Sequence, residues 1–132
     1  MTQAQNPVPF PTETHTYDIV GNRLTDAKTA GTWLYNANNQ LQGFDGISFD
    51  YDANGNTTKK TDANDTAQTR NYVYDTSDRL IGARDQNNVL IASYTYDPFN
   101  RRITKETTGS SGTKTYFLYA DEGLVAEANS SG

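Results

Sequence analysis

The sequence predicts an all-β protein whose strands follow one another in a single antiparallel β-meander. Two observations carry this prediction. A unit made of an aromatic residue, a spacer, a tyrosine and a turn recurs along the chain, and no stretch of ten or more residues has a helical period. Rings at positions i and i+2 lie on one face of a strand, and aromatic residues suit a half-buried sheet surface. Each unit is therefore predicted to form a strand, a sharp reversal and a returning strand.

The unit occurs six times, and its tyrosines are 16 to 23 residues apart. In chain order the copies are His15-Thr16-Tyr17-Asp18, Trp33-Leu34-Tyr35-Asn36, Phe49-Asp50-Tyr51-Asp52, Tyr72-Val73-Tyr74-Asp75, Tyr94-Thr95-Tyr96-Asp97 and Phe117-Leu118-Tyr119. An Asp or Asn directly after the tyrosine can close an Asx-turn. A Gly or Asn four places after the tyrosine tolerates the positive φ of a tight hairpin. An apolar residue then usually opens the returning strand: Leu24, Leu41, Leu80, Ile103 and Leu124.

The gaps between tyrosines hold a second turn at the other end of the strands. These turns are predicted at Asp45-Gly46, Asp62 to Asp65, Asp85 to Asn88 and Thr108 to Gly112. Each repeat should then contribute two strands of about 6–9 residues. Residues 118–128 contain some helix formers, but Gly123 interrupts them and an aromatic-x-tyrosine strand precedes them. We therefore predict a turn followed by a strand there.

Composition and charge exclude several classes of function. The chain has 132 residues and a mass of 14.6 kDa, which suits one domain. Its net charge of −5 disfavours nucleic acid as a partner. With no cysteine and one histidine, thiolate chemistry and histidine-rich metal sites are untenable, and we expect no catalytic residue, metal or cofactor.

Membrane and export signals are not found in this segment. No apolar run approaches the roughly 18–20 residues of a membrane span. The first ten residues have neither the cationic nor the apolar region of a secretory signal peptide. We therefore expect no membrane span and no signal peptide in this segment.

Three turns make the repeat similar to a known family. Tyr17-Asp18 followed by Gly21-Asn22-Arg23-Leu24, Tyr74-Asp75 followed by Asp78-Arg79-Leu80, and Tyr96-Asp97 followed by Asn100-Arg101-Arg102 resemble YD repeats, also called RHS repeats. Such repeats occur in bacterial RHS proteins, in the C components of ABC insecticidal toxin complexes and in animal teneurins. The resemblance covers about residues 15–128.

The resemblance implies a fold and a role. YD repeats form a long antiparallel β-sheet that spirals into a hollow β-shell, which in the toxins encloses a C-terminal effector. This chain would be a short arc of such a shell, non-catalytic itself, and its partners would be the remaining repeats of a longer parent chain and the enclosed effector. The implied localisation is secreted or cell surface, as part of a longer bacterial protein. The family's Asp-Pro-x-Gly cleavage signature is absent, because Asp97-Pro98 is followed by Phe99-Asn100.

We divide the chain into residues 1–14, extended or disordered, a YD-repeat β-sheet domain over residues 15–128, and a flexible tail over residues 129–132. The residues expected to build the repeat are Tyr17, Asp18, Gly21, Trp33, Tyr35, Phe49, Tyr51, Asp52, Gly55, Tyr72, Tyr74, Asp75, Arg79, Leu80, Tyr94, Tyr96, Asp97, Arg101, Phe117 and Tyr119. The rings should pack across neighbouring strands, and the Asp and Gly residues should shape the turns.

Other interpretations of the same residues remain open. Exposed aromatics could bind a glycan or another cell-surface partner, with Trp33 as the candidate ligand-binding residue. The Asx-rich turns after Asp52 and Asp62 resemble fragments of a calcium loop, although the bidentate Glu of such a loop is missing. His15 could act as a base, but it has no partner in the sequence pattern.

Two further expectations concern the sheet edges. The basic pairs Lys59-Lys60 and Arg101-Arg102 are expected at solvated strand edges, where charge blocks edge pairing. A meander of this kind has open edges, so the chain could also associate with copies of itself.

Overall fold

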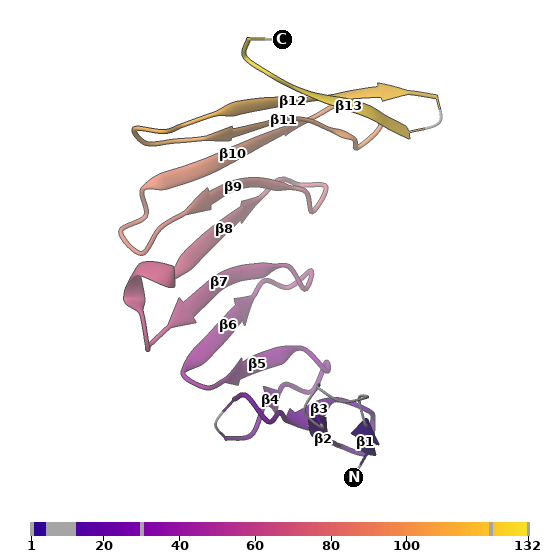
Figure 1. The fold of residues 1–132 in the computed structure, drawn as a ribbon, viewed down its shortest axis with the longest axis vertical. Coiled ribbons are helices and arrows are strands. Elements are labelled where there is room, and N and C mark those ends of the chain that lie inside the picture. Colours follow the sequence, from indigo (N-terminus) through magenta and orange to yellow (C-terminus); the bar gives the residue numbers. More distant parts are fainter. Residues whose placement is uncertain (1, 5–12, 30, 122, 132) are drawn as a thin grey trace.

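The computed structural model describes residues 2–4, 13–29, 31–121 and 123–131, and they form thirteen β-strands and one short 3₁₀ helix (Figure 1). The strands are β1 (Thr2–Ala4), β2 (Glu13–Tyr17), β3 (Arg23–Thr25), β4 (Leu34–Tyr35), β5 (Leu41–Phe44), β6 (Ile47–Tyr51), β7 (Thr57–Asp62), β8 (Arg70–Tyr74), β9 (Leu80–Arg84), β10 (Leu90–Tyr96), β11 (Arg102–Thr107), β12 (Lys114–Ala120) and β13 (Gly123–Asn129). The 3₁₀ helix η1 (Thr66–Gln68) joins β7 to β8.

The predicted fold class is confirmed. Strands β4 to β13 form a ten-stranded sheet in which each strand pairs antiparallel with its neighbours in sequence. Figure 1 shows these strands following one another in a single layer from the N-terminal to the C-terminal end. The predicted turn and strand over residues 118–128 is present as the end of β12 and β13. No helix in the described part of the chain is long and apolar enough to cross a membrane.

Two details differ from the expectation of one meander of long strands. Strands β1, β2 and β3 form a separate three-stranded sheet, and the backbone of β3 is joined to the start of the next repeat by a hydrogen bond from Trp33 N–H to Leu24 C=O at 2.8 Å. Eight of the thirteen described strands are also shorter than the predicted length of about 6–9 residues, with two to five residues each, because every repeat spends residues on turns and on a bulge at its tyrosine.

The N-terminal boundary at residue 14 stays a prediction. Strand β1 lies within residues 1–14 and pairs with β2, with Thr2 opposite His15. Residues 5–12 lie outside the part of the chain that the structure describes.

The turns after the first five repeat tyrosines share one geometry. In the turn after β8, the Asp75 N–H donates to the Arg79 C=O at 3.0 Å, and the Asp78 N–H donates to the Asp75 C=O at 3.1 Å. The residue four places after the tyrosine has positive φ in five turns: Gly21, Asn39, Gly55, Asp78 and Asn100. This is a three-residue hairpin loop that ends in a left-handed residue. At the opposite end of the strands, Asp45 and Gly46 both have positive φ, as a two-residue type I′ hairpin requires.

The sheet has very little core. Its aromatic face, which we define as the face that carries the paired aromatic residues of each repeat, includes Ala83, Ala92 and Phe117, the buried apolar residues of the described chain. On the opposite face Leu34 is 60% exposed and Leu118 is 52% exposed. The accessible surface is 9150 Å², whereas a compact protein of this mass exposes about 6,900 Å². A single uncovered layer explains the excess.

The expectation for the two basic pairs is wrong. Lys59 and Lys60 lie in β7, which pairs with β6 on one side and β8 on the other. Arg102 lies in β11, also an interior strand, and its guanidinium stacks over Phe117 at 4.4 Å. Arg102 covers the rings of Phe117 and Tyr94, and Lys59 and Lys60 are half-buried within an interior strand, so these side chains do not block an edge.

Candidate functional site: the ladder of tyrosines and turns

From the second repeat onward, the tyrosine hydroxyl of each repeat donates a hydrogen bond to the backbone of the repeat before it. The donors are Tyr35, Tyr51, Tyr74, Tyr96 and Tyr119, and their acceptors are the carbonyls of Arg23, Leu41, Thr57, Leu80 and Arg102, at 2.9, 2.7, 3.1, 2.8 and 3.0 Å. We call this set the tyrosine ladder. It crosses from the small sheet to the large one, since Tyr35 of β4 reaches Arg23 of β3.

The acceptor in the ladder always occupies the same position. It is the residue that pairs with the tyrosine of its own hairpin, as Leu80 pairs with Tyr74 and Arg102 pairs with Tyr96. A register shift at the tyrosine, typical of a β-bulge, precedes this pair in every hairpin. The bulge leaves this carbonyl free to accept from the next tyrosine along the sheet.

The strand register beyond the acceptor is constant as well. The residue two places after the acceptor pairs with the residue three places before the next tyrosine. The four pairs between repeats of the large sheet are Gly43–Ser48, Lys59–Asn71, Gly82–Ser93 and Thr104–Tyr116. Successive repeats therefore join through one interface repeated with the same offsets.

Burial affects two of the ladder tyrosines electrostatically. Desolvation raises the pKa of Tyr74 and of Tyr96 above the ordinary tyrosine value. Each phenol is consequently kept protonated, as the donor role in the ladder requires, over a wider pH range than a free tyrosine.

The aspartates after the tyrosines cap their own turns. The Asp75 carboxylate accepts from the Ser77 and Arg79 N–H groups at 2.9 and 3.1 Å and from Arg79 Nε at 2.8 Å. The hydrogen bond from the Arg79 side chain, followed by those from the backbone, lowers the pKa of Asp75. At Asp52 the side chain of Asn56 is the main cause of a lowered pKa. These carboxylates are held ionised by donors on their own loop.

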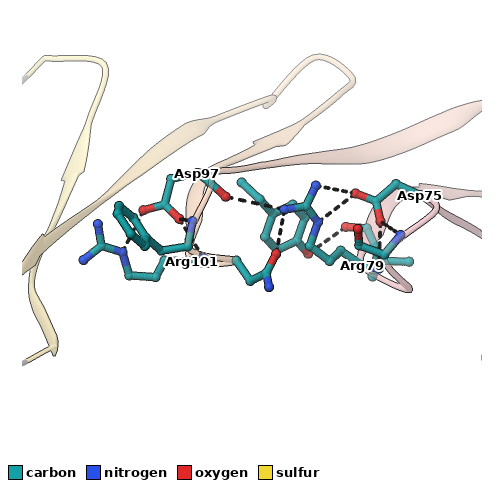
Figure 2. A network of polar contacts seen from close by, with 9 residues as sticks. Asp75, Arg79, Asp97 and Arg101 are labelled. Atoms are coloured by element: carbon teal, nitrogen blue, oxygen red, sulfur yellow. Dashed lines mark hydrogen bonds and ion pairs between the residues drawn. The ribbon is translucent and has the colours of Figure 1, made fainter.

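Neighbouring turns are also linked side by side. Arg79 Nη1 donates to Asn100 Oδ1 at 3.0 Å and to the Asp97 C=O at 3.4 Å, so the ion pair of one turn reaches the next (Figure 2). The amide of Asn56 donates to Asp78 at 2.8 Å in the same way. Gly55 offers no side chain to its neighbour Gln40, so this cross-link has no acceptor at that junction.

Arginines in the fifth position after the tyrosine add a third contact between repeats. The Arg79 guanidinium lies over the Tyr96 ring at 5.0 Å, and that of Arg101 lies over the Tyr119 ring at 5.0 Å. Each of these arginines also pairs with the aspartate of its own turn, Asp75 or Asp97, at 2.7 Å. One side chain therefore closes its turn and covers the ladder tyrosine of the next repeat.

The aromatic positions of the repeat are packed less regularly than expected. Among the described residues, ring stacking joins Trp33 to Phe44 at 4.5 Å and Phe44 to Phe49 at 6.4 Å, and Phe44 is outside the repeat pattern. Elsewhere cations take the place of ring pairs, as Arg102 does over Tyr94 and Phe117. The spacer residue between the two rings of each repeat puts both rings on one face of the sheet. Whether the rings of neighbouring repeats touch depends on the side chains that lie between them.

The last turn departs from the others. Ala120 stands where the other repeats have Asp or Asn, and it pairs with Gly123, so the loop is one residue shorter. Tyr119 nevertheless pairs with Leu124, after the same register shift.

The candidate ligand-binding residue Trp33 is already engaged. Arg23 stacks on its ring at 4.2 Å, Phe44 stacks on it at 4.5 Å, and its indole N–H donates to Thr29 Oγ1 at 3.1 Å. A sugar would have to displace one of these contacts. The carboxylates of the calcium-like turns are similarly occupied, since Asp52 and Asp62 accept from N–H groups of their own loops.

His15 has a partner that the sequence pattern did not show. Its Nε2 lies 3.6 Å from Glu13 Oε2, while its Nδ1 is buried without a hydrogen bond in the described chain. No group of three or more metal-ligating side chains occurs in the parts of the chain that are described. Two surface depressions of about 470 and 490 Å³ each have one carboxylate among their described lining residues, Asp121 or Asp45. Neither set of described lining residues contains a pair of groups for acid–base chemistry.

Sequence reasoning missed part of the site. It found Arg79 and Arg101 but not Asn22, Gln40 and Asn56, which occupy the same fifth position and hydrogen-bond to the Asx residue of their turns. A polar amide or guanidinium five places after each tyrosine was the available signal. The ladder acceptors carry no such signal, because any residue supplies a carbonyl.

These contacts define a repeat protein whose β-hairpins join edge to edge through backbone, tyrosine and turn contacts. The chain belongs to the Teneurin YD-shell family, whose model matches residues 1–126. A search of curated proteins found no match.

Proposed function

We propose that this chain is a structural segment in the wall of a larger β-shell that encloses a C-terminal effector, in a polymorphic toxin or cell-surface protein, and that it has no catalytic role. Its partners would be the remaining YD repeats of a longer parent chain and the enclosed effector. Family membership supports the repeat architecture. The localisation proposed with it is secreted or cell surface, as part of a longer bacterial protein.

One observation carries the proposal: the ten-stranded sheet is a single layer without a second layer on either face in the described chain. Its apolar burial is limited to small patches around Ala83, Ala92 and Phe117. Repeat units that bury little surface alone depend on their neighbours for stability. The polar contacts of the ladder join repeats laterally, which is what the wall of an enclosure requires.

The chemistry of the turns supports a non-catalytic role. The aspartates of the YD turns are ionised, and their oxygens accept hydrogen bonds from their own loops. A general acid needs a raised pKa, whereas the pKa of Asp52 and of Asp75 is lowered by hydrogen bonds, first of all from the side chains of Asn56 and Arg79.

The proposal is tested on the parent protein by limited proteolysis. The polypeptide that follows the repeats should resist a broad-specificity protease in the intact protein and be cleaved rapidly when expressed alone. The double variant Tyr74→Ala/Arg79→Ala, which weakens two contacts between repeats, should expose it. Equal cleavage rates in the intact protein and in the isolated terminal polypeptide would reject an enclosing wall.

A second function, binding of a carbohydrate or another cell-surface partner, is favoured by one ring outside the repeat pattern. Phe99 is 78% exposed at the tip of the turn between β10 and β11, with Arg101 stacked at 5.3 Å. A glycan array with the native chain, Phe99→Ala and Trp33→Ala separates the two functions. Saturable binding that either variant abolishes would establish a binding module, and a blank array would leave the wall as the function.

A further inference from the structure

We propose that the free edge of β13 binds one more antiparallel strand of the aromatic-x-tyrosine type. The tyrosine of that strand would donate to the Leu124 carbonyl, and the residue three places before this tyrosine would lie opposite Ala126. The inference rests on the proposed function, because the strand it names is a further repeat of the same wall.

The edge of β13 is open and apolar. The strand has seven residues and is unpaired on its outer side in the described chain, and Leu124 and Val125 are 53% and 67% exposed. Glu127 is its one charged residue. Stable sheets protect long edges with charge, proline, bulges or a covering segment. An edge with one charge over seven residues is therefore suited to pairing.

The acceptor is identified by the interface that the sheet already repeats. Leu124 pairs with Tyr119 as Arg102 pairs with Tyr96, although its loop is one residue shorter. Two residues further on, Ala126 pairs with Leu118 as Thr104 pairs with Thr95. The pairs on both sides of the bulge therefore show that Leu124 corresponds to Arg102 and Ala126 corresponds to Thr104. Leu124 holds the position whose carbonyl accepts the next tyrosine in five earlier cases.

The register of the incoming strand follows from the same comparison. Thr104, the counterpart of Ala126, pairs outward with Tyr116, three residues before Tyr119. The Thr107 N–H donates to the Thr113 C=O at 2.8 Å, so alternation along β11 makes Thr104–Tyr116 a non-hydrogen-bonded pair. In such pairs the side chains are closest. Ala126 should therefore face the third residue before the incoming tyrosine at a separation that a disulfide can bridge.

The β13 strand of a second copy is a poorer occupant. Strand β13 contains no tyrosine, so pairing of two β13 edges leaves both Leu124 carbonyls without the hydroxyl that the other interfaces supply. An unpaired carbonyl at an interface loses the benefit of one hydrogen bond.

The test uses disulfide exchange, for which the absence of native cysteine gives a clean background. The full chain carrying Ala126→Cys is mixed with a peptide of residues 89–99 that carries Ser93→Cys, because Ser93 lies three residues before Tyr96. The matched protein control is Ala128→Cys, two residues along the same face. The matched peptide control adds Tyr96→Phe. Exchange yields are normalised to those with glutathione, which corrects for thiol exposure.

We expect several-fold more mixed disulfide at Ala126→Cys than at Ala128→Cys, and a loss of about two- to tenfold when the peptide carries Tyr96→Phe, as one net hydrogen bond predicts. Equal yields at the two positions, or no effect of Tyr96→Phe, would overturn the register. A preferred disulfide between two copies of the Ala126→Cys chain would overturn the choice of occupant. The outcome is independent of the proteolysis test, since a wall can enclose an effector without this register and the register can exist in an open scaffold.

Discussion

Removing one hydroxyl from the tyrosine ladder isolates its contribution to stability. Tyr96→Phe deletes the hydrogen bond to the Leu80 carbonyl at 2.8 Å and keeps the ring under Arg79. A net intramolecular hydrogen bond contributes about 0.5–1.5 kcal/mol, and the half-buried Leu80 carbonyl is left without this partner. We therefore expect the free energy of unfolding to fall by about 1 kcal/mol.

The matched control is Tyr94→Phe, on the same strand and the same face. Tyr94 has no hydroxyl hydrogen bond among the described contacts, so its free energy of unfolding should change little. Urea denaturation of the full chain, followed by circular dichroism, gives both midpoints, and an unchanged m-value shows that the comparison is of stability alone. Equal effects of the two substitutions would refute the assignment of stability to the ladder.

Four further changes probe the other contacts between and within repeats. Arg79→Ala should destabilise more than Arg79→Lys, because lysine keeps charge but not the planar stacking on Tyr96, and urea midpoints rank the two. Hydrogen bonds, first from the Arg79 side chain, lower the pKa of Asp75 in the folded chain. The Asp75 carboxylate therefore stabilises the fold above the unfolded pKa of about 3.9, and this stabilisation is lost as the pH falls through the folded pKa. Thermal melting temperatures of the native and Asp75→Asn chains should converge at low pH. Gly55→Ala forces a side chain onto φ +92° and should cost about 1 kcal/mol by urea denaturation, whereas Gly55→Asn, which tolerates this region, should cost less. Tyr74→Ala should cost about 2–4 kcal/mol through lost packing of a half-buried ring, and no loss would contradict the packing argument.

The fold class and the turns could be predicted from the sequence. Alternation of rings predicted strands, and Gly21 and Asn39 were expected at the left-handed positions they occupy. Local patterns predict local geometry because an Asx-turn involves residues only four apart. The lengths of eight strands were overestimated, because a bulge at each tyrosine leaves no mark in the alternation.

Contacts between repeats were harder to predict from the sequence. The stacking of Arg79 on Tyr96 joins residues 17 apart in sequence, and Arg102 on Phe117 joins residues 15 apart. Their geometry depends on the register between hairpins, which the repeat pattern leaves undetermined. The interior position of Lys59 was mistaken for an edge for the same reason, since charge alone does not distinguish an edge strand from an interior strand.

The bulge and the ladder together have a consequence for fidelity. A strand that slides by one residue moves every side chain to the wrong face of the sheet, so the alternating pattern prevents this error. A slide by two residues returns every side chain to its own face, so the hydrophobic pattern does not oppose it. A long sheet of similar hairpins is exposed to that error at each junction. Here a slide by two would carry Tyr96 away from the Leu80 carbonyl and Arg79 away from Asn100 at once. The ladder tyrosines therefore fix the register of each hairpin relative to the hairpin before it.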